Sequence, residues 1–201
     1  MFFKSSDMLT LTLAALLGLT FSTPALAGEV VFGVHNEIGI EWNTDETTIF
    51  FNLTCNTNNV TDPTAALAWC AFGINTNPSG PSSGMAPAYV WWLAINSAGK
   101  ALAVEDRVIS TIAQPPCTKT QLTTTISSSY NAVTGTLSAL FTRPLAAGDA
   151  VKGQGFADII NAPLQVIAAV GAKTRPDNSC ATNQAEHFFH AGNVAINFLS
   201  G

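Results

Sequence analysis

The sequence contains few charged residues and little that matches the common catalytic motifs. Lys and Arg together number eight, against thirteen Asp and Glu, and the formal net charge is -5. The basic residues are scattered singly, so the chain lacks the positive surface that supplies most of the affinity for nucleic acids and anionic lipids. The H-E-x-x-H and P-loop signatures are absent, and the one G-x-S-x-G match, Gly80-Pro-Ser-Ser-Gly84, stands in a Pro/Ser/Gly loop. The sequence therefore argues against nucleic-acid binding and gives little support to hydrolysis.

Long hydrophobic runs are also scarce, and the clearest one lies near the N-terminus. Residues 8–21 are mainly apolar, which is too short a run to cross a bilayer comfortably. Lys4 precedes the run, and Ala25-Leu26-Ala27 follows it with the small-x-small pattern that signal peptidase requires. We therefore expect residues 1–27 to be a cleaved signal peptide and not a membrane anchor. The mature domain would then span residues 28–201, contain no transmembrane segment, and be secreted or periplasmic.

Only four cysteines are present, Cys55, Cys70, Cys117 and Cys180, and in an exported chain they indicate disulfides. None stands in a C-x-x-C or C-x-x-C-H context, so a zinc ribbon, thioredoxin chemistry and covalent haem attachment lack support. Four cysteines allow three pairings, among which the sequence alone does not decide. We favour Cys55–Cys70, which would close a short loop between neighbouring strands, together with Cys117–Cys180, which would join two proline-flanked loops.

Short strand-like runs recur along the chain and are separated by Gly, Pro, Ser and Asn. The expected strands are Glu29–His35, Gly39–Trp42, Thr47–Cys55, Ala65–Ile74, Ala88–Ile95, Ala101–Ser110, Gln121–Ser129, Thr134–Arg143, Leu164–Gly171 and Gly192–Leu199. The run from Ala65 has the Ala and Leu content of a short helix, but Trp69 and Phe72 favour a buried strand. About ten short strands without a convincing long helix predict one all-β domain, an antiparallel β-sandwich.

Metal-ligating side chains are few. After signal cleavage the chain contains one methionine, Met85, at the end of a Pro/Ser/Gly loop. Met85 is either a ligand or a residue that fills a gap at the end of the sandwich. His187 and His190 precede the last expected strand, and their spacing suits a helical metal pair, the two ends of a strand-entry loop, or plain surface histidines.

The order of these features resembles a known family. The chain reads Trp69-Cys-Ala-Phe-Gly73, Gly84-Met85, Glu105-Asp106-Arg107-Val108, Arg143-Pro-Leu-Ala-Ala-Gly148-Asp149, and then His187 before Gly192. This order resembles the DOMON family, and in particular its cytochrome-type members, found in cellobiose dehydrogenase and in proteins fused to cytochrome b561. The resemblance covers roughly residues 36–201.

The resemblance implies an immunoglobulin-like β-sandwich that binds haem b non-covalently through one Met and one His ligand. Met85 matches the first ligand. His187 matches the second better than His190 does, because family members leave several residues between this histidine and the glycine of the last strand. Two axial protein ligands leave no open iron position, which indicates a secreted b-type cytochrome that transfers single electrons, and not an enzyme with substrate chemistry of its own.

Other residues around the expected site have two interpretations each. Arg143 pairs either with a haem propionate or with Asp149, and the second is the simpler expectation. Four aromatic residues are candidates for pocket walls or for ordinary core: Phe72, Trp91, Phe188 and Phe189.

The partner of such a cytochrome would be a redox protein or a small-molecule electron donor or acceptor. Some DOMON domains bind sugars or lack the haem ligands. The alternative function is therefore a haem-free sandwich that binds carbohydrate or another ligand, and a third class is a structural surface domain.

Overall fold

Ten strands form the secondary structure of the described residues. The computed structural model describes residues 26–33, 35–58, 67–76, 87–109, 121–149, 155–173 and 184–200. The strands are β1 (Leu26–Phe32), β2 (Ile38–Thr44), β3 (Thr48–Asn56), β4 (Leu67–Asn75), β5 (Ala88–Ala94), β6 (Glu105–Ile109), β7 (Thr124–Asn131), β8 (Thr136–Pro144), β9 (Leu164–Lys173) and β10 (Gln184–Ile196). Each overlaps one of the expected runs, and the all-β prediction is confirmed.

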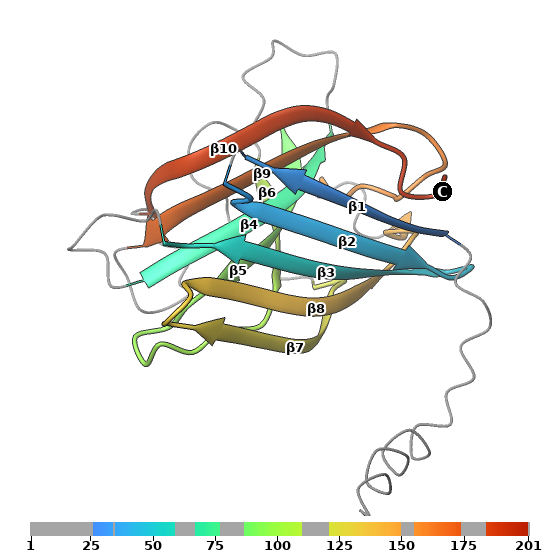
Figure 1. The fold of residues 1–201 in the computed structure, drawn as a ribbon. Coiled ribbons are helices and arrows are strands. Elements are labelled where there is room, and N and C mark those ends of the chain that lie inside the picture. Colours follow the sequence, from blue (N-terminus) through green and yellow to red (C-terminus); the bar gives the residue numbers. More distant parts are fainter. Residues whose placement is uncertain are drawn as a thin grey trace, which may run out of the picture.

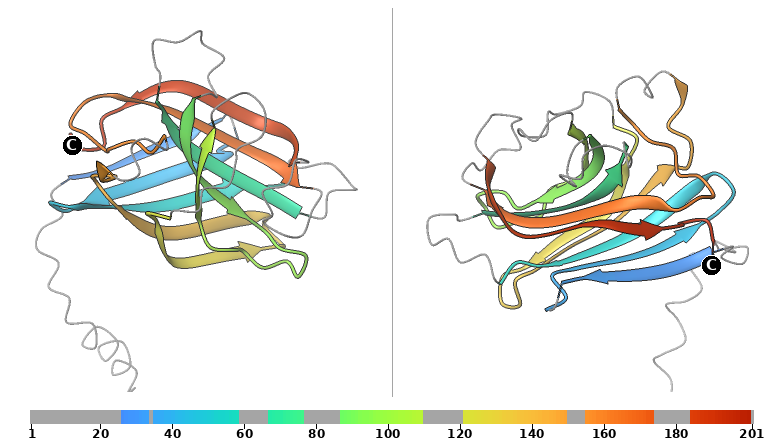
Figure 2. Two further views of the ribbon diagram at one scale, coloured as in Figure 1. Left: turned by 180° about the vertical axis from the view of Figure 1, so that it is seen from behind. Right: turned by 90° about the horizontal axis from the view of Figure 1, so that it is seen from above.

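The strands form two five-stranded antiparallel sheets that face each other as a sandwich. The first sheet has the order β1-β2-β3-β8-β7, and the second has the order β10-β9-β4-β5-β6. In Figure 1 the first sheet lies in front of the second, and Figure 2 shows the two layers from behind and from above. No helix in the described part of the chain is long and apolar enough to cross a membrane.

Alternation of apolar and polar residues explains the first sheet. In β3, Ile49, Phe51 and Leu53 are buried, while Asn52 and Thr54 between them are exposed. Successive strand residues point to opposite faces, so the apolar set packs inward and the polar set meets water. β8 follows the same pattern and pairs with β3 in register.

An aromatic cluster fills the space between the sheets. Phe51 of the first sheet lies 5.0 Å, centroid to centroid, from both Phe72 and Trp91 of the second. Phe198, which follows β10, closes the cluster against Phe51 at 5.6 Å. Phe72 and Trp91 are thus ordinary core residues and not walls of a ligand pocket, whereas the side chains of Phe188 and Phe189 lie outside the described set.

The disulfide Cys55–Cys70 is confirmed, but its position differs from the expectation. Cys55 lies in β3 and Cys70 in β4, with Cα atoms 6.5 Å apart. These strands follow one another in the chain but belong to facing sheets, so the bond crosses the core instead of linking paired neighbours. Cys117 and Cys180 lie outside the described residues.

The last strand differs most from its prediction. β10 begins at Gln184, eight residues before the expected start at Gly192, and it is paired with β9 from there to Ile196. Its register shifts at three places, where extra residues interrupt the alternation on which the sequence prediction relied.

Candidate ligand-binding face of the second sheet

The expected ligand Met85 lies outside the described residues, in the connection between β4 and β5. The base of this connection is closed by a hydrogen bond from the Thr76 N–H to the Pro87 carbonyl oxygen, at 2.9 Å. Met85 stands only two residues before Pro87 in the sequence. Its attachment point in the fold is therefore the end of the second sheet at which β4 ends and β5 begins.

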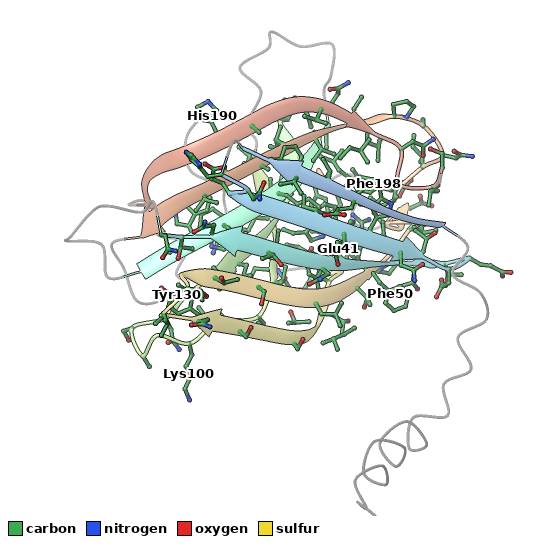
Figure 3. The ribbon with its side chains drawn as sticks, in the orientation of Figure 1. Glu41, Phe50, Lys100, Tyr130, His190 and Phe198 are labelled. Atoms are coloured by element: carbon green, nitrogen blue, oxygen red, sulfur yellow. A yellow bond between two sulfur atoms is a disulfide. The ribbon has the colours of Figure 1, made fainter. Side chains whose placement is uncertain are left out.

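Both candidate histidines lie inside β10. His187 pairs with Gly171 of β9, and His190 pairs with Ala169. The interpretations as a helical pair and as a strand-entry loop are therefore wrong. His190 is exposed, and Figure 3 labels it on β10.

A β-bulge changes the relation between these two positions. Residues three apart in a regular strand lie on opposite faces. Here the register shifts between His187 and Phe189, while the partners Gly171 and Ala169 are only two residues apart on β9. Residues two apart on β9 lie on the same face of the sheet, and paired residues share a face. Because of the extra residue, the backbone positions of His187 and His190 therefore lie on one face of the second sheet.

That face is the outer one, directed away from the aromatic core. In β4, β5 and β9, residues that alternate with the core residues form a second buried apolar cluster: Trp69, Ala71, Trp92, Ala94 and Ala169. Trp69 of β4 is paired with Gly171 of β9, and Ala71 of β4 is paired with Ala169 of β9, so these residues share the outer face. Every residue of β5 is buried, so this strand is covered on both faces.

Two tryptophans dominate the outer face. The indoles of Trp69 and Trp92 stack with centroids 4.1 Å apart and planes 18° from parallel. Trp69 also extends over β9, where a Cβ atom at Gly171 would lie 2.5 Å from Trp69 Cζ2. Gly171 therefore leaves space for the Trp69 indole, and Gly171 is also the residue with which His187 is paired.

A charged residue completes the face on β6. Arg107 is fully buried, and its Cζ atom lies 4.5 Å from the centroid of the Trp92 ring. Its Nη2 atom donates to Glu105 Oε2 at 2.8 Å, and its Nε atom donates to the same oxygen at 3.2 Å. Arg107 Nη1 and Trp92 Nε1 are buried without a hydrogen-bond partner. Sequence reasoning assigned no role to Arg107, although an Arg in an otherwise buried strand is a signal for one.

A separate polar network lies on the inner side of the same strands. Asp106 is fully buried and accepts hydrogen bonds from the Tyr89 hydroxyl, the Leu122 N–H, the Thr123 N–H (2.8 Å) and the Thr123 hydroxyl (2.5 Å). Burial raises the pKa of Tyr89 well above its usual value, against the opposing effect of the Arg143 charge. The network fixes the segment before β7 to β6, because a buried carboxylate needs these donors.

Arg143 belongs to this inner network, with partners that differ from those expected. It donates to the carbonyl oxygens of Pro144 at 2.9 Å and Ala157 at 2.7 Å, and its Cζ atom lies 5.0 Å from the Tyr89 ring centroid. The expected pairing with Asp149 is replaced by these contacts. Arg143 belongs to β8 of the first sheet and points into the core, so it does not reach the outer face of the second sheet.

A cavity of about 320 Å³ opens at one end of the sandwich. It is lined by Ile74, Asn75, Thr76, Phe156, Ala157, Pro163, Leu164 and Gln165. None of the residues predicted as ligands is among them. Within the described part of the chain, no group of three or more His, Cys, Asp or Glu side chains is placed to hold a metal ion.

Comparison with known proteins gives a likeness of fold. No protein-family model matches the chain, and no curated protein matches its sequence. Among solved structures, the chain is similar to the cytochrome domain of Myriococcum thermophilum cellobiose dehydrogenase, with a TM-score of 0.55 and 14% sequence identity. The match covers 87% of this chain and 84% of that domain. At this identity the likeness concerns the sandwich and not its ligands.

Proposed function

We propose that this protein is an exported b-type cytochrome that binds haem b non-covalently and transfers single electrons between redox partners. The observation that carries the proposal is the outer face of the second sheet. This face is apolar, buried and rich in tryptophan. The backbone positions of His187 and His190 in β10 lie on the same face. The fold likeness to a cytochrome domain supports the same assignment.

The described residues of the outer face suit a porphyrin in polarity. Ala71, Ala94 and Ala169 give the face a floor of small side chains beside the stacked Trp69 and Trp92. A planar apolar ring system is buried favourably against such a surface. The unpartnered donors of Arg107 and Trp92 supply polar groups at the side of the face formed by β5 and β6.

Met85 and His187 are the ligands that we assign to the iron, with His190 as the alternative to His187. A thioether and an imidazole suit low-spin iron and raise its reduction potential relative to two imidazoles. When bound, the haem supplies the one-electron chemistry. Met85 and His187 would hold the iron, the apolar face would exclude water from it, and the two packed sheets would keep the site rigid.

Export remains part of the proposal. Cleavage after Ala27 would remove two residues of β1 and leave Gly28–Phe32 paired with β2. The buried Cys55–Cys70 disulfide is compatible with an oxidising compartment. Peptide mapping without reduction tests the remaining expectation, the pairing of Cys117 with Cys180, and free thiols at both positions would contradict it.

The competing function, a carbohydrate-binding module, finds no support at the adjacent tryptophans. Trp91 is enclosed in the core, and Trp92 is 3% exposed beneath the outer surface. Neither ring is open for stacking against a sugar, and the same burial of the outer face applies to haem, so the absorption spectrum decides between the two functions.

The deciding experiment is the absorption spectrum of the purified full chain. We expect a Soret band with sharp reduced α and β bands, either on purification or after addition of haem to colourless protein. Reversible one-electron titration should then follow in a potentiometric cell. A protein that stays colourless with excess haem would contradict the proposal.

A further inference from the structure

Two donor nitrogen atoms on the outer face of the second sheet have no acceptor. The N–H groups of Arg107 Nη1 and of Trp92 Nε1 make up this set, and both nitrogen atoms are buried. The two side chains are in direct contact, because the guanidinium lies over the indole at 4.5 Å. Donors that are buried without a partner cost free energy, and the cost is larger for a charged group. Two such donors on touching side chains suit a shared acceptor.

The chemistry of that acceptor follows from the guanidinium. Glu105 occupies the Nε and Nη2 edge of Arg107 and leaves the Nη1 side free of a hydrogen-bond partner. Glu105 is 28% exposed and is screened by water, whereas the guanidinium is 1% exposed. The buried positive charge therefore favours an anionic acceptor on its remaining side. A planar carboxylate has two oxygens, and charge-assisted bonds to Arg are the strongest of this kind.

We propose that Arg107 and Trp92 form the binding site for a carboxylate of the bound ligand, which is a propionate of haem if the proposed function is correct. The site lies on β5 and β6, on the outer face of the second sheet. The backbone positions of His187 and His190 lie on the same face because of the bulge in β10. Arg143 is excluded from this role by its position in the core, although the sequence offered it as the propionate partner. The two residues act as positioning groups that select the orientation of the ligand.

The test compares two probes that differ only in whether their two carboxylates are free or esterified. Colourless protein is titrated with haem b and with haem dimethyl ester, in which both carboxylates are esterified, and binding is followed at the Soret band. We expect the unmodified chain to prefer haem over the ester by on the order of tenfold to a hundredfold, the equivalent of one charge-assisted hydrogen bond. Arg107→Gln should weaken haem binding by that factor and leave ester binding nearly unchanged.

Two further variants separate the contact from a general loss of structure. Trp92→Phe keeps an aromatic ring against Trp69 and removes only the indole N–H, so it should reduce the preference for haem by a smaller factor. Glu105→Gln removes the neighbouring charge and keeps both donors, so the preference should persist or rise. Far-ultraviolet circular dichroism of each variant checks that the sandwich is intact.

The outcomes separate this inference from the function on which it rests. Equal binding of haem and ester by the unmodified chain, or an undiminished preference in both Arg107→Gln and Trp92→Phe, would overturn the carboxylate site and leave the cytochrome assignment standing. If Arg107→Gln does not fold, Trp92→Phe alone decides. Failure of the unmodified chain to bind either compound would overturn the proposed function and this site together.

Discussion

The two sheets bury their inner faces alike, yet their outer faces differ. The outer face of the first sheet carries short polar side chains that meet water, such as Asn52 and Thr54 of β3. Of the residues of this sheet that Figure 3 labels, Glu41 and Phe50 are on the outer face, opposite the core residues. The outer face of the second sheet carries Trp69 and Trp92, which are nearly inaccessible.

This difference indicates where function resides. A sandwich needs only one buried face per sheet for stability, so a second buried face is an additional feature of the molecule. Buried donors without partners occur on this face, at Arg107 and Trp92, and also in the core, at Arg143 and Trp91. The additional face alone adjoins the bulged strand that carries both histidines. The first sheet is the support, and the second is the candidate site.

The largest expected effect is the loss of the cofactor after ligand changes on the second sheet. His187→Ala should lose most of the bound haem, whereas His190→Ala, the matched control, should leave the spectrum and the reduction potential nearly unchanged. The reverse result would make His190 the ligand. If neither change affects the spectrum, the assignment to β10 is wrong.

Changes at Met85 sharpen the same comparison. Met85→His should keep a six-coordinate low-spin spectrum and lower the potential, because imidazole stabilises ferric iron better than a thioether does. Met85→Ala should open a position that takes up carbon monoxide. Unchanged spectra in both variants would remove Met85 from the site.

The next largest effect comes from a charge placed on each outer face. Ala71→Lys buries an unpaired ammonium group beside the tryptophans and should cost about 3 kcal/mol or more of unfolding free energy. Thr54→Lys places the same group on the exposed face of β3 and should change stability by less than about 0.5 kcal/mol. Urea denaturation measures both, and equal losses would mean that the faces do not differ in burial.

A smaller effect is expected from one added methyl group. Gly171→Ala would bring Cβ to 2.5 Å from Trp69 Cζ2, and the displacement of the indole should cost roughly 1–3 kcal/mol. Gly39→Ala is the control on the first sheet, where the nearest atom, Thr54 O, lies 4.0 Å away. That change should be neutral or slightly stabilising, because alanine restricts the unfolded chain. Thermal unfolding of both variants is the measurement.

The smallest effect concerns an exposed apolar residue of the first sheet. Leu140 of β8 is 38% exposed. Leu140→Thr should alter the free energy of unfolding by less than about 0.5 kcal/mol and leave haem binding unchanged. A loss of haem in this variant would show that the outer face of the first sheet also takes part in function.

Local patterns in the sequence predicted the strands well. The aromatic content of residues 65–74 correctly favoured a strand over a helix. In the structure, β3 and β8 show the period-two alternation of burial that is typical of a half-buried strand. β6 proved shorter than expected, since its pairing with β5 extends only from Glu105 to Ile109. The expected start of β10 was wrong because a bulge interrupts the period that identifies a strand.

The sequence by itself determined the fold class, the apolar core residues and the scarcity of candidate ligands, because each depends on composition or on neighbours in the chain. Tertiary structure alone decided that Cys55 and Cys70 join facing sheets, that Arg143 lies in the core, and that Arg107 touches Trp92. These facts depend on strand order and register, which are set by contacts between distant residues. One residue of register exchanges the two faces of a strand, so only the assembled sheet brings the positions of His187 and His190 to the same side.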